Sequence, residues 1–286
     1  MNNLICYRSL AIWDCFSLPE VFLKKHNTKI GTWAKLTIFS GSLNFAFLNK
    51  EGEVIKVKSF NKDNQPPFIE PQQWHRIISI SDDIRCQLSF YCEKEHYYEK
   101  KYGLKPVHSE IKAAVNLIEP GKALDLGCGR GRNSLFLNQN GFDLTAWDKD
   151  SKNIEQLQEI IQKESLINIR SEIKNINYSS YGEKFDFIFS TVVFMFLEAD
   201  RIPFIIQNMQ ECTNKGGYNL IVSAMNSDDY PCRLPFSFTF SPNELKSYYQ
   251  EWELRKYNED VGELHKLDEN GNRIKLRFAT ILARKK

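Results

Sequence analysis

Residues 123–134 restrict most strongly what this chain can fold into. They read Ala-Leu-Asp-Leu-Gly-Cys-Gly-Arg-Gly-Arg-Asn-Ser, and the apolar residues 135–137 follow directly. A short apolar run, three alternating glycines and a helix-compatible segment predict a buried strand, a tight turn and the start of a helix. Glycine tolerates positive φ and has no Cβ, so this turn predicts a close approach of the backbone to a ligand.

Besides Asp125 before the glycines, the unit has a second acidic residue, Asp148, after them. Asp148 ends the next apolar run, residues 142–148. A carboxylate at the end of the second strand suits a ribose diol, because it accepts hydrogen bonds from both hydroxyls. The pattern therefore predicts a cofactor that contains adenosine.

The glycine spacing narrows the choice of cofactor. A phosphate-binding loop needs Gly-x4-Gly-Lys-Ser/Thr, which this stretch lacks, and the glycines at 127, 129 and 131 are one residue too close for a dinucleotide fold. Asp125, just before the turn, would repel a pyrophosphate. S-adenosylmethionine has no phosphate, and its ammonium suits an acidic neighbour, bound directly or through water. We therefore expect S-adenosylmethionine as the cofactor.

Composition and charge exclude other classes of protein. The chain has 38 basic and 36 acidic side chains, a near-balance that gives no support for a nucleic-acid partner. No apolar run approaches the roughly 20 residues of a membrane span, and the start of the chain does not read as a secretory signal. The seven cysteines are scattered without a C-x-x-C pair, so neither a zinc site nor a disulfide framework is expected. Reduced thiols in a cytoplasmic protein are the expectation.

Residues 1–92 are predicted to form a small all-β domain. Short apolar segments separated by Gly, Asn, Asp and Pro turns are typical of a sandwich or small barrel. The predicted strands are residues 4–7, 33–40, 43–48, 54–60, 74–80 and 84–91.

Residues 93–286 alternate between helical and strand patterns. The predicted helices are residues 109–118, 152–163 and 203–212. Residues 215–217 are expected to end the third of these, and a capping box at 241–244 predicts the start of a fourth helix. The further predicted strands are 167–173, 185–190, 218–224, 252–257 and 275–284. This order predicts an α/β fold: a doubly wound, Rossmann-like sheet with helices on both faces and an antiparallel edge.

The N-terminal part resembles the small cupin-like domains of the TehB/YeaR type. The resemblance is carried by residues 18–20, 26–33, 39–43 and 70–75. Many cupins hold a metal with a His-x-His pair, an acid and a further histidine. Here His26 and His75 stand without such a pair, so we expect no metal and a structural or interface role for both.

The C-terminal part resembles the class I methyltransferases, and more closely the TehB family of tellurite-resistance methyltransferases. The similar blocks are residues 107–110, 124–134, 146–149, 190–198, 217–222, 229–232, 256–265 and 270–279. The resemblance implies a Rossmann-like methyltransferase sheet preceded by the cupin-like domain. It also implies methylation of tellurite and selenium oxyanions with S-adenosylmethionine.

The resemblance also implies which residues bind the cofactor. Gly127 and Gly129 are expected to approach its amino-acid part, and Asp148 its ribose. Asn175 and Ile176, after the third strand of this sheet, are expected near the adenine. Four further residues complete the predicted cofactor site: Tyr102, Asp125, Arg132 and Thr191. Arg132 either binds the cofactor carboxylate or caps the sheet edge, and Tyr102 either covers the cofactor or packs within the protein.

Three cations are predicted to hold the oxyanion substrate. His265 and Arg273 lie in the block where the family places its active-site cations, and Lys266 stands where the family pattern has arginine. Lysine keeps the charge but loses the bidentate fork. His265 either orients the oxyanion or takes a proton from it.

Two other functions stay open at this level. One is a methyltransferase of broad small-molecule substrates such as thiols. The other is a ligand sensor in which the β-domain captures a small molecule. Because such β-domains pair through sheet edges, we also expect a homodimer.

Overall fold

The structure, a computed structural model, describes residues 4–267 and 269–286, apart from the side chains of His265 and Lys266. The chain divides into two compact units, residues 1–106 and 107–286. Each is described by itself below.

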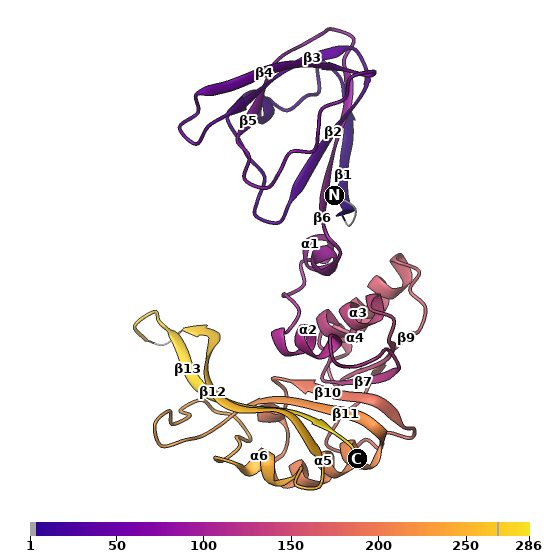
Figure 1. The fold of residues 1–286 in the computed structure, drawn as a ribbon, viewed down its shortest axis with the longest axis vertical. Coiled ribbons are helices and arrows are strands. Elements are labelled where there is room, and N and C mark those ends of the chain that lie inside the picture. The colour runs from indigo at the N-terminus through magenta and orange to yellow at the C-terminus, as the bar shows by residue number, and fades with distance from the viewer. Residues whose placement is uncertain (1–3, 268) are drawn as a thin grey trace. The chain divides into compact units, whose positions relative to one another are not determined.

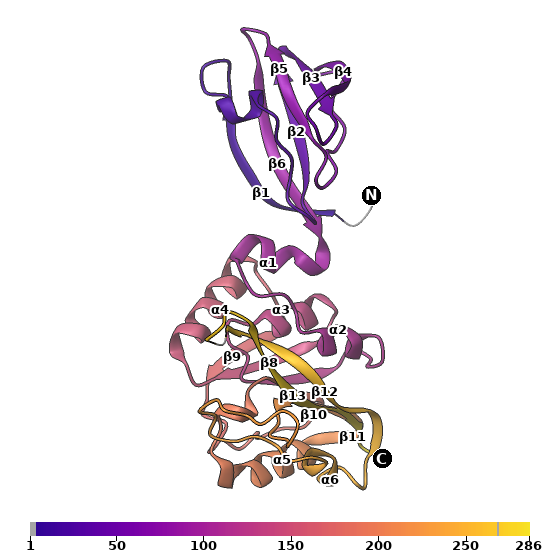
Figure 2. The same cartoon turned by 90° about the vertical axis from the view of Figure 1, so that its left-hand side faces the viewer.

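The first unit contains two antiparallel three-stranded sheets (Figures 1 and 2). One has the strand order β1-β6-β2 and the other β4-β3-β5. The strands are β1 (Leu4–Trp13), β2 (Trp33–Ser40), β3 (Ser42–Leu48), β4 (Val54–Asn61), β5 (His75–Ile80) and β6 (Arg85–Glu93). Alternating side chains of both sheets form one apolar core, as expected of stacked sheets. This confirms the predicted small all-β architecture.

Short helical segments complete the first unit. The 3₁₀ turn Glu20–Leu23 follows β1, and Lys94–His96 leads into helix α1 (Tyr97–Tyr102). Gly103 ends α1 in the left-handed conformation at φ 63°. A residue without Cβ adopts this conformation at little cost, which makes glycine the usual helix terminator.

The second unit is built on a seven-stranded sheet with the order β12-β13-β11-β10-β7-β8-β9 (Figure 1). Its strands are β7 (Lys122–Leu126), β8 (Asp143–Asp148), β9 (Ile169–Ile173), β10 (Phe185–Thr191), β11 (Thr213–Ala224), β12 (Glu253–Leu267) and β13 (Arg273–Arg284). β7 to β11 are parallel, and β13 pairs antiparallel with β11 and β12. The predicted fold class, a Rossmann-like sheet with an antiparallel edge, is confirmed.

Helices cover both faces of this sheet (Figure 1). They are α2 (Ser109–Val115), α3 (Arg132–Gln139), α4 (Ser151–Lys163), α5 (Ile202–Glu211) and α6 (Glu244–Ser247). Successive strand residues point to opposite faces. Phe187 and Phe189 therefore pack with side chains of α2 and α3, whereas Ile188 packs with those of α5 and α6. Near-continuous apolar strands of this kind are typical of a parallel sheet covered on both faces.

Two predictions about the C-terminal half are wrong. Residues 215–217 do not close a helix: α5 ends at Glu211, and these residues lie in β11 at an irregularity of its pairing with β10. β12 runs on to Leu267, ten residues beyond the predicted end of that strand, because it stays paired with β13. His265 and Lys266 consequently lie on a strand rather than in a connecting loop.

Candidate active site

The glycine turn joins β7 to α3 and is tied to the neighbouring strand. Gly127, Gly129 and Gly131 all have positive φ, at 84°, 55° and 85°. The backbone N–H groups of Gly127 and Cys128 both donate to the carbonyl of Trp147 at 2.8 Å. The turn is thereby held at the carboxyl end of β8, where ligands of open α/β sheets bind.

The three glycines differ in their surroundings. A Cβ on Gly127 would lie 2.5 Å from Cγ2 of Val193, and one on Gly131 would collide with the side chain of Leu157. A Cβ on Gly129 would meet nothing within 4 Å. Packing inside the protein therefore requires glycine at 127 and 131, whereas Gly129 borders open space that a ligand can fill.

Asp148 connects the end of β8 to the turn. Its Oδ2 accepts from the N–H of Gly129 at 2.8 Å, and its Oδ1 accepts from the N–H of Asp150 at 2.9 Å. A carboxylate offers about four acceptor positions. Asp148 therefore keeps acceptor capacity for ligand hydroxyls beside the open face of Gly129.

Asp125 lies inside the sheet directly below the turn. It is 1% exposed and accepts from the hydroxyl of Ser134 at 2.6 Å. Burial raises the pKa of Asp125 to about 7, although Ser134 and Arg132 act in the opposite direction. Its main partner in the structure is thus a side chain of α3.

Arg132 begins α3 and is half-buried. Burial lowers the pKa of Arg132, and the charge of Asp125 opposes this effect. The same guanidinium helps to lower the pKa of His108, for which burial is the main cause. The charge of Arg132 therefore acts on both Asp125 and His108, the N-cap residue of α2.

Thr191 ends β10 and joins a buried polar chain. Its hydroxyl oxygen accepts from Nδ2 of Asn133 at 3.0 Å, and Oδ1 of Asn133 accepts from the N–H of His108 at 3.1 Å. The hydroxyl of Ser190 donates to the carbonyl of Leu126 at 2.9 Å. These bonds join α3, β10 and the start of α2 at the carboxyl edge of the sheet.

The residue after Thr191 has an unusual backbone. Val192 has φ 61°, a left-handed conformation that a β-branched residue adopts only with strain. Its N–H donates to the carbonyl of Val222 at 2.7 Å, which holds the conformation in place. This turn places Val193 next to Gly127, so the loop after β10 packs against the glycine turn after β7.

The loop after β9 contains the two residues predicted to lie near an adenine. Asn175 is exposed, and its Oδ1 accepts from the N–H of Asn177 at 3.1 Å. Ile176 is buried in the core beside Trp147. Ile176 thus forms an apolar wall, while the side chain of Asn175 shapes the loop.

Two family models match the sequence. Residues 90–282 match the family model described as tellurite resistance protein TehB, and residues 8–88 match the TehB-like domain. The chain belongs to the TehB family. The sequence-based assignments to this family and to its class of S-adenosylmethionine-dependent methyltransferases are confirmed.

Two relatives align with all or most of the chain. The "Probable S-adenosyl-L-methionine-dependent methyltransferase TehB" of Haemophilus influenzae strain 10810 is 54% identical over 285 residues, which cover 100% of this chain and 99% of the relative. "Hemagglutinin 1" of Eikenella corrodens is 45% identical over 238 residues, 83% of this chain and 79% of that protein.

Solved structures agree with the fold. The crystal structure of TehB from Haemophilus influenzae superimposes with a TM-score of 0.93 at 54% identity, covering 100% of this chain and 99% of that one. The YcgJ protein of Bacillus subtilis, at 13% identity and a TM-score of 0.50, covers 63% of this chain and 99% of its own. That second likeness shows the fold alone.

The predicted substrate cations of this TehB family member lie on the β12–β13 hairpin. Arg273 is the first residue of β13 and forms a 3.9 Å ion pair with Glu263, with both side chains about half exposed. It stands five residues nearer the hairpin tip than Phe278, which pairs with the last residue of β11, so it lies roughly 16 Å beyond the end of β11 along the hairpin. The backbone of His265 and Lys266 lies on β12, but their side chains are outside the described part of the structure.

Arg277 is a residue that sequence reasoning missed. It lies on β13, one residue before Phe278, and its Nε donates to both carboxylate oxygens of Asp229 at 3.0 Å. Its Nη1 also donates to the carbonyl of Glu259. Arg277 and Ser227 lower the pKa of Asp229 to about 2. The pair joins the loop after β11 to the hairpin. Asp229 and Arg277 lie in two of the family-like blocks, 229–232 and 270–279, which is the signal that could have led to the pair.

Tyr102, His26 and His75 lie in the first unit. Tyr102 stacks on Tyr98 with ring centroids 6.2 Å apart within α1. The rings of His26 and His75 are 4.2 Å apart, and each Nδ1 bonds to a backbone carbonyl, of Lys24 and Gln73 respectively. A cofactor role for Tyr102 stays a prediction.

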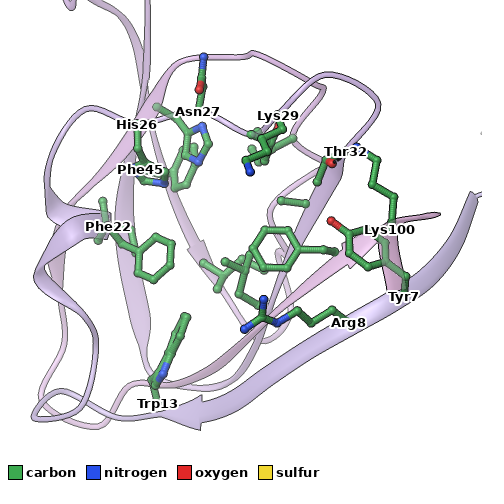
Figure 3. A pocket seen from close by; sticks show the side chains of 18 of the residues that line it. Tyr7, Arg8, Trp13, Phe22, His26, Asn27, Lys29, Thr32, Phe45 and Lys100 are labelled. Atoms are coloured by element: carbon green, nitrogen blue, oxygen red, sulfur yellow. Dashed lines mark hydrogen bonds between the residues drawn. The ribbon is translucent and has the colours of Figure 1, made fainter. Parts of the chain in front are cut away.

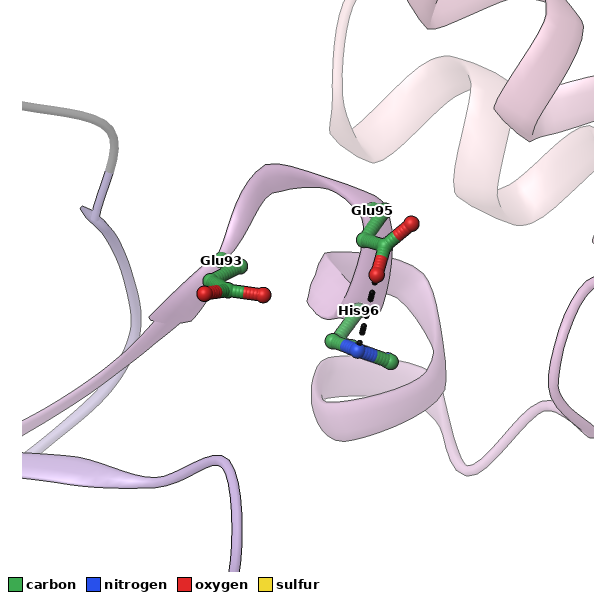
Figure 4. Close-up of side chains that lie close together, drawn as sticks. All are labelled: Glu93, Glu95 and His96. Atoms are coloured by element: carbon green, nitrogen blue, oxygen red, sulfur yellow. Dashed lines mark ion pairs between the residues drawn. The ribbon is translucent and has the colours of Figure 1, made fainter. Parts of the chain in front are cut away.

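Among the described residues, one group of three potential metal ligands comes together, formed by Glu93, Glu95 and His96 (Figure 4). His96 is already bonded to Glu95 and Glu99, each at 3.1 Å. The two glutamates of the group are exposed, and the group includes neither His26 nor His75.

Proposed function

We propose that this chain transfers the methyl group of S-adenosylmethionine to tellurite and to related selenium oxyanions, and so contributes to tellurite resistance. The observation that carries the cofactor assignment is the hydrogen bond between Gly129 and Asp148 beside open space. The match to a tellurite-resistance family model supports the substrate.

The residues at the carboxyl edge suit this cofactor. Asp148 would hold the ribose hydroxyls, the open face at Gly129 would receive the amino-acid part, and Ile176 would form an apolar wall for the adenine. Asp125 is buried and accepts a hydrogen bond from Ser134. It would therefore attract the ammonium across the glycine turn, without direct contact. When bound, S-adenosylmethionine supplies an electrophilic methyl group on its sulfonium.

The substrate side of the proposal rests on positive charge. A chalcogen oxyanion attacks through a lone pair on the chalcogen, so the protein must orient the anion and exclude water. Arg273 and the family positions His265 and Lys266 would supply this charge from the hairpin. His265 would orient the anion, or take its proton if the protonated form binds.

The test compares substrates with the purified full chain. Release of S-adenosylhomocysteine is measured with tellurite, selenite and a neutral thiol at equal concentrations. We expect turnover with both oxyanions and much slower turnover with the thiol. Equal rates with the thiol would favour the broad-substrate methyltransferase, and binding of S-adenosylmethionine without turnover on any substrate would favour the sensor.

The proposal assigns different tasks to the two parts of the chain. We propose residues 93–286 as the methyltransferase domain and residues 1–92 as the β-domain that mediates a homodimer. β4 supports this, because it is an edge strand and exposes Val54, Ile55 and Val57.

We place the reaction in the cytoplasm, where the seven cysteines, all free in the structure, would stay reduced. No helix in the described residues is long and apolar enough to cross a membrane.

A further inference from the structure

A cavity of about 760 Å³ lies in the first unit (Figure 3). Its interior is lined by apolar side chains from both sheets, among them Trp13, Leu36, Phe45, Ile77 and Leu88. A volume of this size falls in the range of small-molecule sites, which are mostly apolar with a few polar groups. The two sheets therefore enclose space for an organic body of modest size.

Aromatic rings form one wall of this cavity. Phe22 lies 5.0 Å from Trp13 and 5.2 Å from His26, measured between ring centroids. His75 stacks on Phe45 at 5.2 Å with an interplanar angle of 16°. Aromatic side chains that line a cavity favour contact with an aromatic ligand.

The histidines of this wall are neutral at physiological pH. Burial lowers the pKa of His26, and burial together with the charge of His26 lowers that of His75 to about 4. With Nδ1 donating to a backbone carbonyl in each ring, Nε2 is left as an acceptor. The wall therefore carries no charge whose desolvation would oppose binding of an apolar ring.

Positive charge is concentrated on other lining residues. Arg8 and Lys29 are exposed and extend toward the cavity in Figure 3, and within the described residues neither side chain forms an ion pair. Lys100 donates to the carbonyl of Ile30 at 2.9 Å and to Thr32 Oγ1 at 3.2 Å, which leaves one of its three donors. Lys101, a fourth lining cation, donates to the hydroxyl of Tyr97 at 2.7 Å.

One acidic side chain also lines the cavity. Glu99 bonds to Nδ1 of His96 at 3.1 Å. Four cations therefore face one carboxylate, and that carboxylate already has a partner. Arg8 and Lys29 form no ion pair within the described residues, so both cations are available to an anionic ligand.

We propose that the first unit binds a small aromatic carboxylate, with its ring against the wall formed by Phe22, Phe45 and Trp13 and its carboxylate on Arg8 and Lys29. This binding site is separate from the methyl-transfer site and does not depend on the proposed reaction. A carboxylate pairs bidentately with a guanidinium, which fixes its orientation. The apolar interior then selects ligands with a ring.

The test titrates three probes into the full-length protein by calorimetry: benzoate, benzyl alcohol and acetate. Benzyl alcohol keeps the ring without the charge, and acetate keeps the charge without the ring. We expect saturable binding of benzoate, with each of the other probes bound at least about tenfold more weakly, since each lacks one of the two interactions. No binding of benzoate, or equal binding of benzyl alcohol, would overturn the proposal.

Variants locate the site. Arg8→Gln and Lys29→Gln are exposed substitutions that should leave folding intact, and each is expected to weaken benzoate binding about tenfold, as loss of a charge-assisted hydrogen bond does. Lys56→Gln, an exposed lysine on β4 outside the cavity, is the matched control and should bind as wild type does. Unchanged affinity in the Arg8→Gln/Lys29→Gln double variant would show that benzoate binds elsewhere and that the proposal is wrong.

Discussion

The backbone N–H of Gly129 donates to the carboxylate of Asp148 at 2.8 Å. This bond joins the turn after β7 to the end of β8, so the two residues predicted to hold one cofactor form a single unit before any ligand binds. A ligand that engages Asp148 therefore meets an acceptor whose position is already determined by the turn.

Asp148→Ala removes both the ribose acceptor and the anchor of the turn. We expect the affinity for S-adenosylmethionine to fall roughly 100-fold, because two charge-assisted hydrogen bonds to ligand are lost. Isothermal titration measures this. Asp148→Asn keeps one acceptor oxygen and should lose roughly tenfold. Wild-type affinity in Asp148→Ala would show that the cofactor lies elsewhere.

Gly127→Ala and Gly129→Ala are expected to fail in different ways. At 127 the new methyl group collides with Val193, which costs about 1–3 kcal/mol of unfolding free energy in addition to strain at positive φ. Adding Val193→Ala should recover part of that loss, and urea unfolding measures both. Gly129→Ala meets no neighbour, so it should lose only about 1 kcal/mol of stability but bind S-adenosylmethionine much more weakly. Equal destabilisation by the two substitutions would contradict these assignments.

Asp125 should make stability depend on pH. Its pKa is about 7 in the folded protein, above the ordinary value of 3.8, so the folded state binds the proton more tightly than the unfolded state. Its contribution to stability is therefore full below about pH 4 and is lost as pH rises toward 7.

Urea unfolding of wild type and Asp125→Asn at pH 5, 6 and 8 tests this. As pH rises, wild type should lose stability relative to the variant, by an amount on the order of a few kcal/mol. Ser134→Ala removes a hydrogen bond that lowers this pKa, so it should move the transition to higher pH. A stability difference between wild type and Asp125→Asn that does not change with pH would rule out titration of this carboxyl group.

Arg273→Ala should lower turnover of tellurite while leaving S-adenosylmethionine binding unchanged. We expect a loss of kcat/KM on the order of 10- to 100-fold, as for removal of one charged contact to an anion. Lys275→Ala is the matched control, because Lys275 lies two residues along β13 and makes the same 3.9 Å contact with Glu263. Equal losses in both variants would mean that general positive charge, rather than Arg273 itself, acts on the substrate.

Local patterns predicted the elements that surround the site. The alternation of apolar strands and amphipathic helices predicted the succession of strands and helices along the chain from β7 to β11, since such periodicity depends on near neighbours in the chain. The same reasoning ended β12 ten residues early, because residues 258–267 have no strand-like alternation of their own and stay extended through pairing with β13. Arg277 escaped prediction for a similar reason: its partner Asp229 lies 48 residues away.

The sequence by itself determined the strand-turn-helix unit and the phosphate-free cofactor, because glycine spacing and acidic residues at strand ends are properties of short segments. The TehB family followed from the resemblance of further sequence blocks, among them residues 256–265 and 270–279. Tertiary structure decided that, of the three glycines of the turn, Gly129 is the one that borders open space, that Asp125 is buried against Ser134, and that a cavity with a cationic lining lies in the first unit. These features depend on which distant side chains pack together, since burial and the collision of a Cβ with Val193 arise only once the strands and helices are assembled.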